Sequence, residues 1–129
     1  MKKLQKETKF LNSYLNDFSN LIKPNENLIK KLIEVKNIFL KTSKKKGKIL
    51  IFGNGGSAAI ASHVSVDLTK NARIRTVNFN EADLITCFSN DYGYEKWVEK
   101  AVDFYADKND TLVLISSSGK SKNMINACK

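Results

Sequence analysis

The sequence predicts an α/β fold in which a parallel β-sheet is covered by helices and preceded by an N-terminal helical arm. Short apolar runs alternate with helical patterns, two of these runs lead directly into loops of small residues, and residues 1–46 carry only helical periodicity. A chain of 129 residues has the length of about one domain. We therefore expect an arm over residues 1–46 that serves assembly, and one α/β domain over residues 47–129.

The arm is predicted to consist of two amphipathic helices. Between residues 4 and 22 apolar side chains recur at steps of three and four, and Pro24 ends this first helix. The same spacing recurs over residues 28–39 and gives way to a polar, lysine-rich segment that ends at Gly47. Because the apolar faces must be buried on the following domain or on another subunit, we expect a homo-oligomer.

The strands of the domain are predicted from uninterrupted apolar runs, which are typical of parallel strands buried on both faces. Helical patterns follow them, as in a sheet with covered faces. Three strands make a thin sheet for this fold, and the last helix has room for barely two turns, so we expect the sequence to be truncated at its C-terminus. The predicted strands cover residues 49–52, 75–79 and 111–115, and the predicted helices cover residues 57–69, 81–88 and 94–105, with a last helix beginning near residue 123.

The formal net charge of +9 lies entirely in the N-terminal part of the chain. Residues 1–48 hold thirteen lysines against four acids, whereas basic and acidic residues balance over residues 49–129. No aromatic side chains interleave with the lysines, so we expect a solvated face and no nucleic-acid partner. No apolar run approaches the roughly 18 residues of a membrane span, so we expect no membrane partner. With only Cys87 and Cys128, a cytoplasmic protein without disulfides is predicted.

The first strand leads into a glycine-rich loop, Gly53 to Ser57 (GNGGS). Its glycines let the backbone turn tightly and approach a ligand closely. Ser57 is the expected N-cap of the following helix, and a helix N-terminus favours an anion. A tight turn without a ligand, or a dinucleotide fingerprint of the form GxGxxA, fits the same residues. The dinucleotide alternative would place Asn78 or Glu81 on a ribose.

The third strand leads into a serine-rich loop, Ser116 to Ser121 (SSSGKS). Its four hydroxyls and its backbone N–H groups suit a phosphate or the hydroxyls of a sugar. A Walker A loop does not fit, because its first glycine would fall at Leu114. Ligands of open parallel sheets bind beyond the carboxyl ends of the strands, where both loops lie. The two loops together predict a sugar-phosphate site without a nucleotide cofactor.

Four segments together resemble the phosphoheptose isomerase branch of the SIS (sugar isomerase) family: Gly53 to Ser57, residues 63–69 (HVSVDLT), residues 90–94 (NDYGY) and Ser116 to Ser121. The resemblance runs from about residue 47 to the end, and the arm fits the helical arm of the family. It implies a flavodoxin-like, three-layer SIS sandwich that is commonly a homotetramer. It also implies conversion of sedoheptulose 7-phosphate to D-glycero-D-manno-heptose 7-phosphate, for the heptose of lipopolysaccharide or capsule.

Such an aldose–ketose isomerisation moves a proton between adjacent carbons through an enediol, which requires a carboxylate base and an acid near the carbonyl oxygen. His63 and Asp67 are four residues apart, and therefore on one face of the predicted helix. The resemblance implies that Asp67 is the base and a metal ligand, and that His63 is a second ligand of a zinc ion. The predicted substrate-binding residues are Asn54, Gly55, Gly56, Ser57, Asp67, Asn90, Asp91, Ser116, Ser117, Ser118 and Ser121.

Two departures from the family pattern bear on catalysis. The family normally has Glu at the position of Asp67, and Asp is shorter by one methylene, about 1.5 Å of reach. The family's other acid and metal-ligand residues, a Gln and a His, lie in its C-terminal half, and His63 is the only histidine here. Each residue also has an alternative without a functional role: His63 could make an ordinary hydrogen bond, and Asp67 could be a solvated carboxylate on the helix surface. A non-catalytic SIS module that binds a sugar phosphate or a protein partner is the alternative function.

Overall fold

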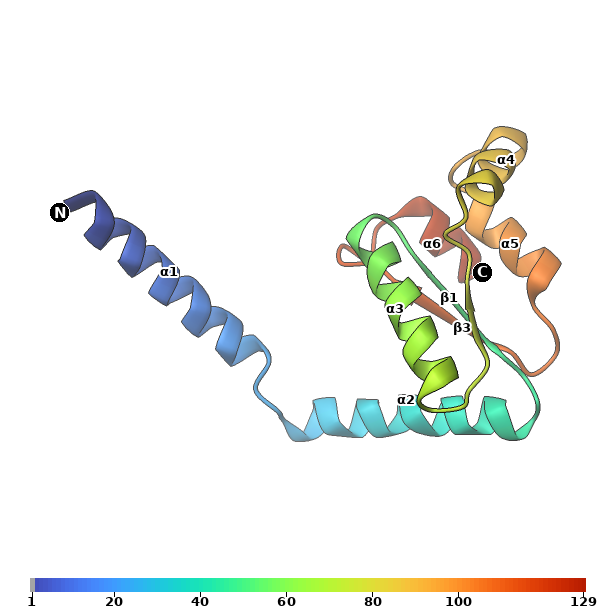
Figure 1. The fold of residues 1–129 in the computed structure, drawn as a ribbon, viewed down its shortest axis with the longest axis horizontal. Helices are drawn as coiled ribbons and strands as arrows, with labels where there is room; N and C mark the ends of the chain where they lie inside the picture. Colours follow the sequence, from blue (N-terminus) through green and yellow to red (C-terminus); the bar gives the residue numbers. More distant parts are fainter. Residues whose placement is uncertain (1) are drawn as a thin grey trace. The chain divides into compact units, whose positions relative to one another are not determined.

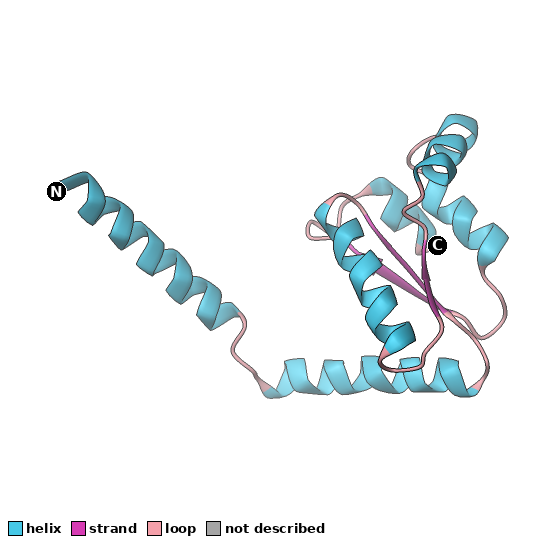
Figure 2. Cartoon of the chain, in the orientation of Figure 1, coloured by secondary structure: helices cyan, strands magenta, loops and turns pink. Residues whose placement is uncertain are grey.

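The computed structural model describes residues 2–129, with side chains from Lys3 onward (Figure 1, Figure 2). The chain divides into two compact units, one up to Val35 and the other over Lys36–Lys129. The predicted boundary after residue 46 stays a prediction. Of the described helices, none combines the length and apolar character needed to cross a membrane. The elements are α1 (Lys2–Leu21), α2 (Glu26–Lys44), β1 (Ile49–Gly53), α3 (Gly56–Lys70), β2 (Thr76–Asn78), α4 (Ala82–Tyr92), α5 (Trp97–Tyr105), β3 (Thr111–Ile115) and α6 (Lys122–Ala127).

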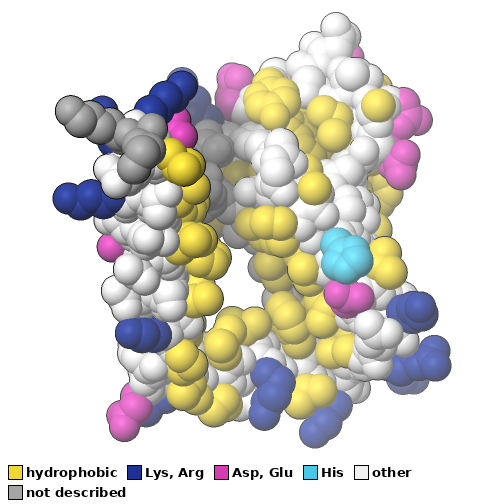
Figure 3. Space-filling model, turned by 60° about the vertical axis from the view of Figure 1, so that its left-hand side comes forward, with side chains coloured by type: hydrophobic (Ala, Val, Ile, Leu, Met, Phe, Trp, Pro, Cys, Tyr) yellow, Lys and Arg dark blue, Asp and Glu magenta, His cyan; other side chains and the backbone are white. Residues whose placement is uncertain are grey.

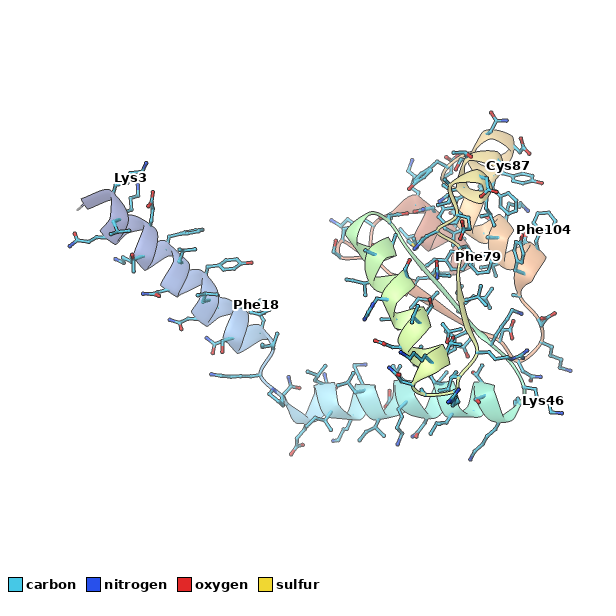
Figure 4. The ribbon with its side chains drawn as sticks, viewed as in Figure 1. Lys3, Phe18, Lys46, Phe79, Cys87 and Phe104 are labelled. Atoms are coloured by element: carbon cyan, nitrogen blue, oxygen red, sulfur yellow. The ribbon has the colours of Figure 1, made fainter. Side chains whose placement is uncertain are left out.

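The two amphipathic helices that the sequence predicts are present: α1 lies in the first unit, whereas α2 begins there and continues into the second unit. Asn25 begins the second of them, because its Oδ1 accepts the backbone N–H of Leu28 at 2.9 Å and so caps the helix. Large apolar side chains of α1, including Phe10 and Phe18, are exposed. Figure 3 shows hydrophobic side chains gathered along one side of the N-terminal helices, and Figure 4 labels Phe18 on α1. This unit therefore carries an apolar face that it does not bury itself.

The second unit is built on a parallel sheet with strand order β2-β1-β3. Ile49 of the central strand lies opposite Thr76 on one side and Thr111 on the other. All five residues of β1 are buried, as expected for a central strand covered on both faces. The three predicted strands are confirmed. The strand β2 ends at Asn78, and Phe79 beyond it turns into the core.

Helices cover both faces of this sheet (Figure 1). Successive strand residues point to opposite faces. Leu50 and Phe52 join a buried cluster with Trp97 and Val98 of α5 and Met124 of α6, whereas α3 packs on the opposite face of the sheet. The ring of Phe79, which Figure 4 labels, stacks on the ring of Phe52 with centroids 4.7 Å apart. The predicted three-layer α/β architecture is confirmed.

Candidate functional site

The glycine-rich loop and the serine-rich loop leave the sheet at the same edge. Gly53, the last residue of β1, lies opposite Ile115, the last residue of the neighbouring parallel strand β3. The carboxyl ends of neighbouring parallel strands are the usual place of a ligand in this class of sheet. The sequence prediction that both loops belong to one edge is therefore correct.

Gly53 allows α3 to start very close to the sheet. A Cβ at this position would lie 2.3 Å from the carbonyl oxygen of Ser57 and 2.7 Å from the backbone nitrogen of Ala58. No side chain fits there without moving the backbone of α3. The backbones of the strand and the helix are therefore too close for a side chain to fit between them, and the loop that joins them makes a tight turn.

The predicted N-cap is wrong by two residues. Ser57 lies inside α3, and Gly55 holds the N-cap position with φ 54° and ψ −121°, without a side-chain cap hydrogen bond. The carbonyl oxygens of Asn54 and Gly55 already accept the N–H groups of Ser57 and Ala58, each at 3.0 Å. The turn therefore tightens before Ser57, because glycine tolerates a positive φ that serine avoids.

In the serine-rich loop, two hydroxyls shape the turn. The Oγ of Ser116 accepts the N–H of Gly119, and the Oγ of Ser118 accepts the N–H of Lys120, each at 3.1 Å. Gly119 has φ 62°, so the turn uses the freedom of glycine. Each hydroxyl keeps its own O–H as a donor. Ser121 precedes α6 without a side-chain cap hydrogen bond, and Ser117 is exposed.

Side chains that the sequence did not single out as a pair tie the two loops together. The amides of Asn54 and Asn123 bond reciprocally, with Nδ2···Oδ1 distances of 3.0 and 2.9 Å. Tyr94 donates its hydroxyl to the Oδ1 of Asn54 at 3.2 Å. Asn123 lies two residues past the serine-rich loop, and an isolated asparagine in a helical pattern carries no signal of such a bond. Only the fold brings it to the glycine-rich loop.

Asn90 and Asp91 lie in the last turn of α4, which continues four residues past the end predicted at residue 88. Gly93, with φ 86°, ends the helix, and its N–H donates to the carbonyl oxygen of Ser89 at 3.0 Å. The Nδ2 of Asn90 donates to the Oδ1 of Asp91 at 3.0 Å. Within residues 3–129, no hydrogen bond joins either side chain to the two loops. The helix α5 starts three residues later than predicted, at Trp97.

His63 and Asp67 lie on one face of α3, as predicted, and that face is turned to solvent. The Nε2 of His63 lies 3.5 Å from the Oδ2 of Asp67, and the two side chains are 81% and 54% exposed. Asn71 donates its Nδ2 to the Oδ1 of Asp67 at 3.2 Å. Asp67 lies eleven residues past Gly56, about 16 Å along the helix axis. Its carboxylate and the glycine-rich loop therefore occupy opposite halves of α3.

His63 and Asp67 alone do not make a metal centre. Among the residues that the structure describes, no group of three or more His, Cys, Asp or Glu side chains could hold an ion. A catalytic zinc site normally has three protein ligands. The pair present in this chain thus supplies donors of the right chemical type but one fewer than zinc requires.

The inner face of α3 is held to the end of β2 by amide side chains. Asn80 donates its Nδ2 to the carbonyl oxygen of Ala58 at 2.8 Å and to the Oγ of Ser62 at 2.6 Å. Asn78 donates to the Oγ of Ser65 at 2.9 Å. Asn78 is therefore committed to the helix–strand contact, which disfavours the alternative in which it binds a ribose.

Comparison with known proteins supplies the family. A family model described as "SIS domain" matches residues 10–129. The chain is 37% identical over 108 residues to a phosphoheptose isomerase of Helicobacter pylori, covering 79% of this chain and 56% of the relative. It is 34% identical over 125 residues to a phosphoheptose isomerase of Aliarcobacter butzleri, covering 92% of this chain and 66% of the relative. The chain thus spans between half and two thirds of the length of such curated relatives.

The fold agrees with a solved structure of the same kind. The phosphoheptose isomerase of Neisseria gonorrhoeae superposes with a TM-score of 0.78 at 29% sequence identity, covering 99% of this chain and 68% of that chain. The likeness includes the N-terminal helices, since it extends over nearly the whole chain.

Proposed function

The chain belongs to the SIS domain family, and we propose that it binds a sugar phosphate as part of a phosphoheptose isomerase. The reaction would be the conversion of sedoheptulose 7-phosphate to D-glycero-D-manno-heptose 7-phosphate, which supplies heptose for lipopolysaccharide or capsule. The observation that carries the proposal is the placement of two hydrogen-bonding loops at the ends of neighbouring strands, β1 and β3, joined through Asn54 and Asn123.

The two loops would hold the phosphate and the sugar hydroxyls. The backbone N–H groups of Gly55 and Gly56, which precede the two that are bonded within the turn, and the O–H groups of Ser116 and Ser118 are donors, and an anionic oxygen is their natural acceptor. Gly55 and Gly56 leave open space where a side chain would otherwise stand: a Cβ at either position would meet no atom within 4 Å. A ligand can therefore approach the backbone of this loop closely. Asn54, Ser57, Ser117 and Ser121 complete the proposed set on the loops.

Asp67 would be the base that carries a proton between the two reacting carbons. In sedoheptulose 7-phosphate these carbons lie at the opposite end of the molecule from the phosphate. Asp67 likewise lies far along α3 from the glycine-rich loop, where the phosphate would bind. A proton-transfer site works best where water is excluded, and Asp67 is 54% exposed. We therefore infer that a further surface covers this face, and Asn90 and Asp91 would contact the sugar once it is bound.

The covering surface we propose is another copy of the chain. Ile60 and Val66 of α3 are exposed beside the face that carries His63 and Asp67, and the apolar side chains of α1 are exposed too. Association would bury both sets of side chains, which favours a homo-oligomer. The family resemblance implies that this oligomer is a tetramer. A cytoplasmic location accords with two free cysteines, Cys87 and Cys128.

Zinc is the metal that the family pattern implies, and His63 and Asp67 would be two of its ligands. Because two ligands are one fewer than a catalytic zinc site has, the described residues do not fit a complete centre. The role of base proposed for Asp67 is proton transfer by its carboxylate and does not depend on a bound metal.

The proposal is tested by binding and by turnover. We expect titration calorimetry to detect binding of sedoheptulose 7-phosphate by the chain, and Ser118→Ala to weaken that binding about tenfold, the effect of losing one hydrogen bond to a charged group. Ser19→Ala, on the exposed α1, is the control that should leave affinity unchanged. Appearance of the aldose phosphate, followed by NMR, tests turnover. No binding by the parent chain would overturn the proposal.

A non-catalytic sugar-phosphate module is the second candidate function. The observation that favours it is the environment of Asp67, whose side-chain partners among the described residues are His63 on the same helix and Asn71, the residue that caps its C-terminus. Tight binding of sedoheptulose 7-phosphate without turnover, in an assembly shown to be oligomeric, would favour this candidate.

A further inference from the structure

The amide pair between Asn54 and Asn123 has a defined orientation, and that orientation has a consequence for the ligand. Asn123 is 2% exposed. Its Oδ1 accepts the backbone N–H of Met124 at 3.1 Å, a hydrogen that is shared with the carbonyl oxygen of Ser121 at 3.0 Å. A backbone N–H can only donate, so the atom facing it must be the oxygen of the Asn123 side chain.

This one backbone contact determines the orientation of the second amide. With its oxygen on Met124, Asn123 presents its Nδ2 to Asn54 at 2.9 Å, and the facing atom of Asn54 must be its oxygen. The Nδ2 of Asn54 then donates to the Oδ1 of Asn123 at 3.0 Å. Turning either amide over would set like atoms against each other in both bonds.

The hydrogen-bonding capacity of Asn54 is therefore nearly exhausted by the protein itself. Its Oδ1 accepts from both Asn123 and Tyr94, which occupies its two lone pairs. One of its two Nδ2 hydrogens is donated to Asn123. A single N–H remains, and it belongs to the residue that starts the glycine-rich loop.

We propose that Asn123 is a positioning residue that, with Tyr94, locks the amide of Asn54 so that it offers the ligand one N–H donor and no acceptor. This rests on the proposed function, because the ligand is taken to be a sugar phosphate. A locked donor selects an oxygen acceptor, such as a phosphate oxygen. Because the Asn54 amide is already ordered before the ligand binds, binding does not have to order it. The pair also ties the start of α6 to the glycine-rich loop, so the two loops keep their separation.

The test compares binding of sedoheptulose 7-phosphate by the parent chain, Asn54→Ala, Asn123→Ala and the double variant. We expect Asn123→Ala to weaken binding about tenfold in the parent background, equivalent to one hydrogen bond, and to have no effect once Asn54 is Ala. Tyr94→Phe, at an exposed side chain, should weaken binding about threefold without affecting folding. Equal affinity of the parent and Asn123→Ala would overturn the inference while leaving the proposed function intact.

Two further measurements separate positioning from loss of folding. Asn123→Asp keeps the side-chain volume and the acceptor for Met124, but its carboxylate cannot donate to Asn54. When the pH is lowered until this carboxylate is protonated, the affinity of the variant for the sugar phosphate, relative to the parent, should recover. In the ligand-free parent, NMR should show slow exchange of the Nδ2 hydrogen that Asn54 donates to Asn123, and Asn123→Ala should remove that protection. An unprotected Asn54 amide in the parent would overturn the locked orientation, whether or not a ligand binds. Absence of binding by the parent would overturn the proposed function and, with it, the role of the remaining N–H.

Discussion

The ammonium of Lys48 lies 2.6 Å from the Oδ2 of Asp110, and the backbone N–H of Lys48 donates to the Oδ1 of the same carboxylate at 2.7 Å. The two residues immediately precede β1 and β3, so this contact joins the strands at the edge opposite the glycine-rich and serine-rich loops. The side chains are 18% and 4% exposed. Asp110 also accepts the backbone N–H of Asp107 at 2.8 Å, and every oxygen of its carboxylate is therefore in use.

Replacing Asp110 by Asn should destabilise the chain markedly. Asn keeps one acceptor but leaves the largely buried Lys48 ammonium without its closest counter-charge, at a cost of about 2 kcal/mol or more in the free energy of unfolding. Urea denaturation followed by circular dichroism measures it. Asp107→Asn is the matched control, because Asp107 is 82% exposed and an exposed ion pair contributes about 0.5 kcal/mol. Equal effects of the two substitutions would contradict the assigned role of burial.

The same contact predicts a loss of stability in acid. Burial raises the pKa of the Asp110 carboxyl, but hydrogen bonds from Lys48 and from the backbone of Asp107 outweigh it, so the pKa lies below its ordinary value. A group with a lowered folded-state pKa contributes stability above its unfolded pKa, about 4, and loses it as pH falls through the folded value. Thermal unfolding of the parent should therefore show a fall below pH 4 that is smaller in Asp110→Asn.

Lys48, the partner of Asp110, should make the stability of the chain depend on pH at the alkaline end. Burial lowers the pKa of Lys48, but its bonds to Asp107 and Asp110 outweigh this and raise it above its ordinary value. Its contribution to stability is complete below about pH 10.5 and is lost as pH rises through the raised value. In Lys48→Met this alkaline component of the unfolding profile should be absent. An unchanged alkaline profile would contradict the ion pair.

Gly53→Ala should be among the most damaging small substitutions. The added Cβ would lie 2.3 Å from the backbone oxygen of Ser57, so α3 must move off the sheet, at a cost of about 3 kcal/mol. Gly56→Ala is the control: its Cβ meets no atom within 4 Å, and the change should be neutral or stabilise by about 0.5 kcal/mol through a less flexible unfolded chain. Similar melting temperatures for the two variants would show that the close approach of α3 is not needed.

Asp67→Glu should increase isomerisation if Asp67 is the base. The extra methylene restores about 1.5 Å of reach, and proton transfer depends steeply on contact geometry, so turnover should rise by about tenfold or more. Asp67→Asn should abolish it. Asn71→Ala removes only a neighbour of the carboxylate and should change turnover little. NMR detection of the aldose phosphate measures all three, and equal rates for Asp67→Glu and Asp67→Asn would remove Asp67 from the base role.

The elements that could be predicted from the sequence are those whose signal is local. The apolar runs 49–52 and 111–115 are strands, and the small residues after them are loops at one sheet edge. The errors are at boundaries. The sequence predicts Ser57 as the cap of α3, but Gly55 takes the positive φ and the cap position, and α4 runs on to Tyr92, where Gly93 ends it.

The α/β class, the glycine-rich and serine-rich loops and the His63–Asp67 face of α3 follow from the sequence alone, because apolar periodicity, glycine and serine clusters and a spacing of four residues are all local properties of the chain. The contacts of Asn54 with Asn123 and Tyr94, and the pairing of Lys48 with Asp110, emerge only in the folded chain. These contacts join residues 40 to 69 positions apart, and their partners come together only after parallel strands have been set side by side by crossover connections, for which no local pattern exists.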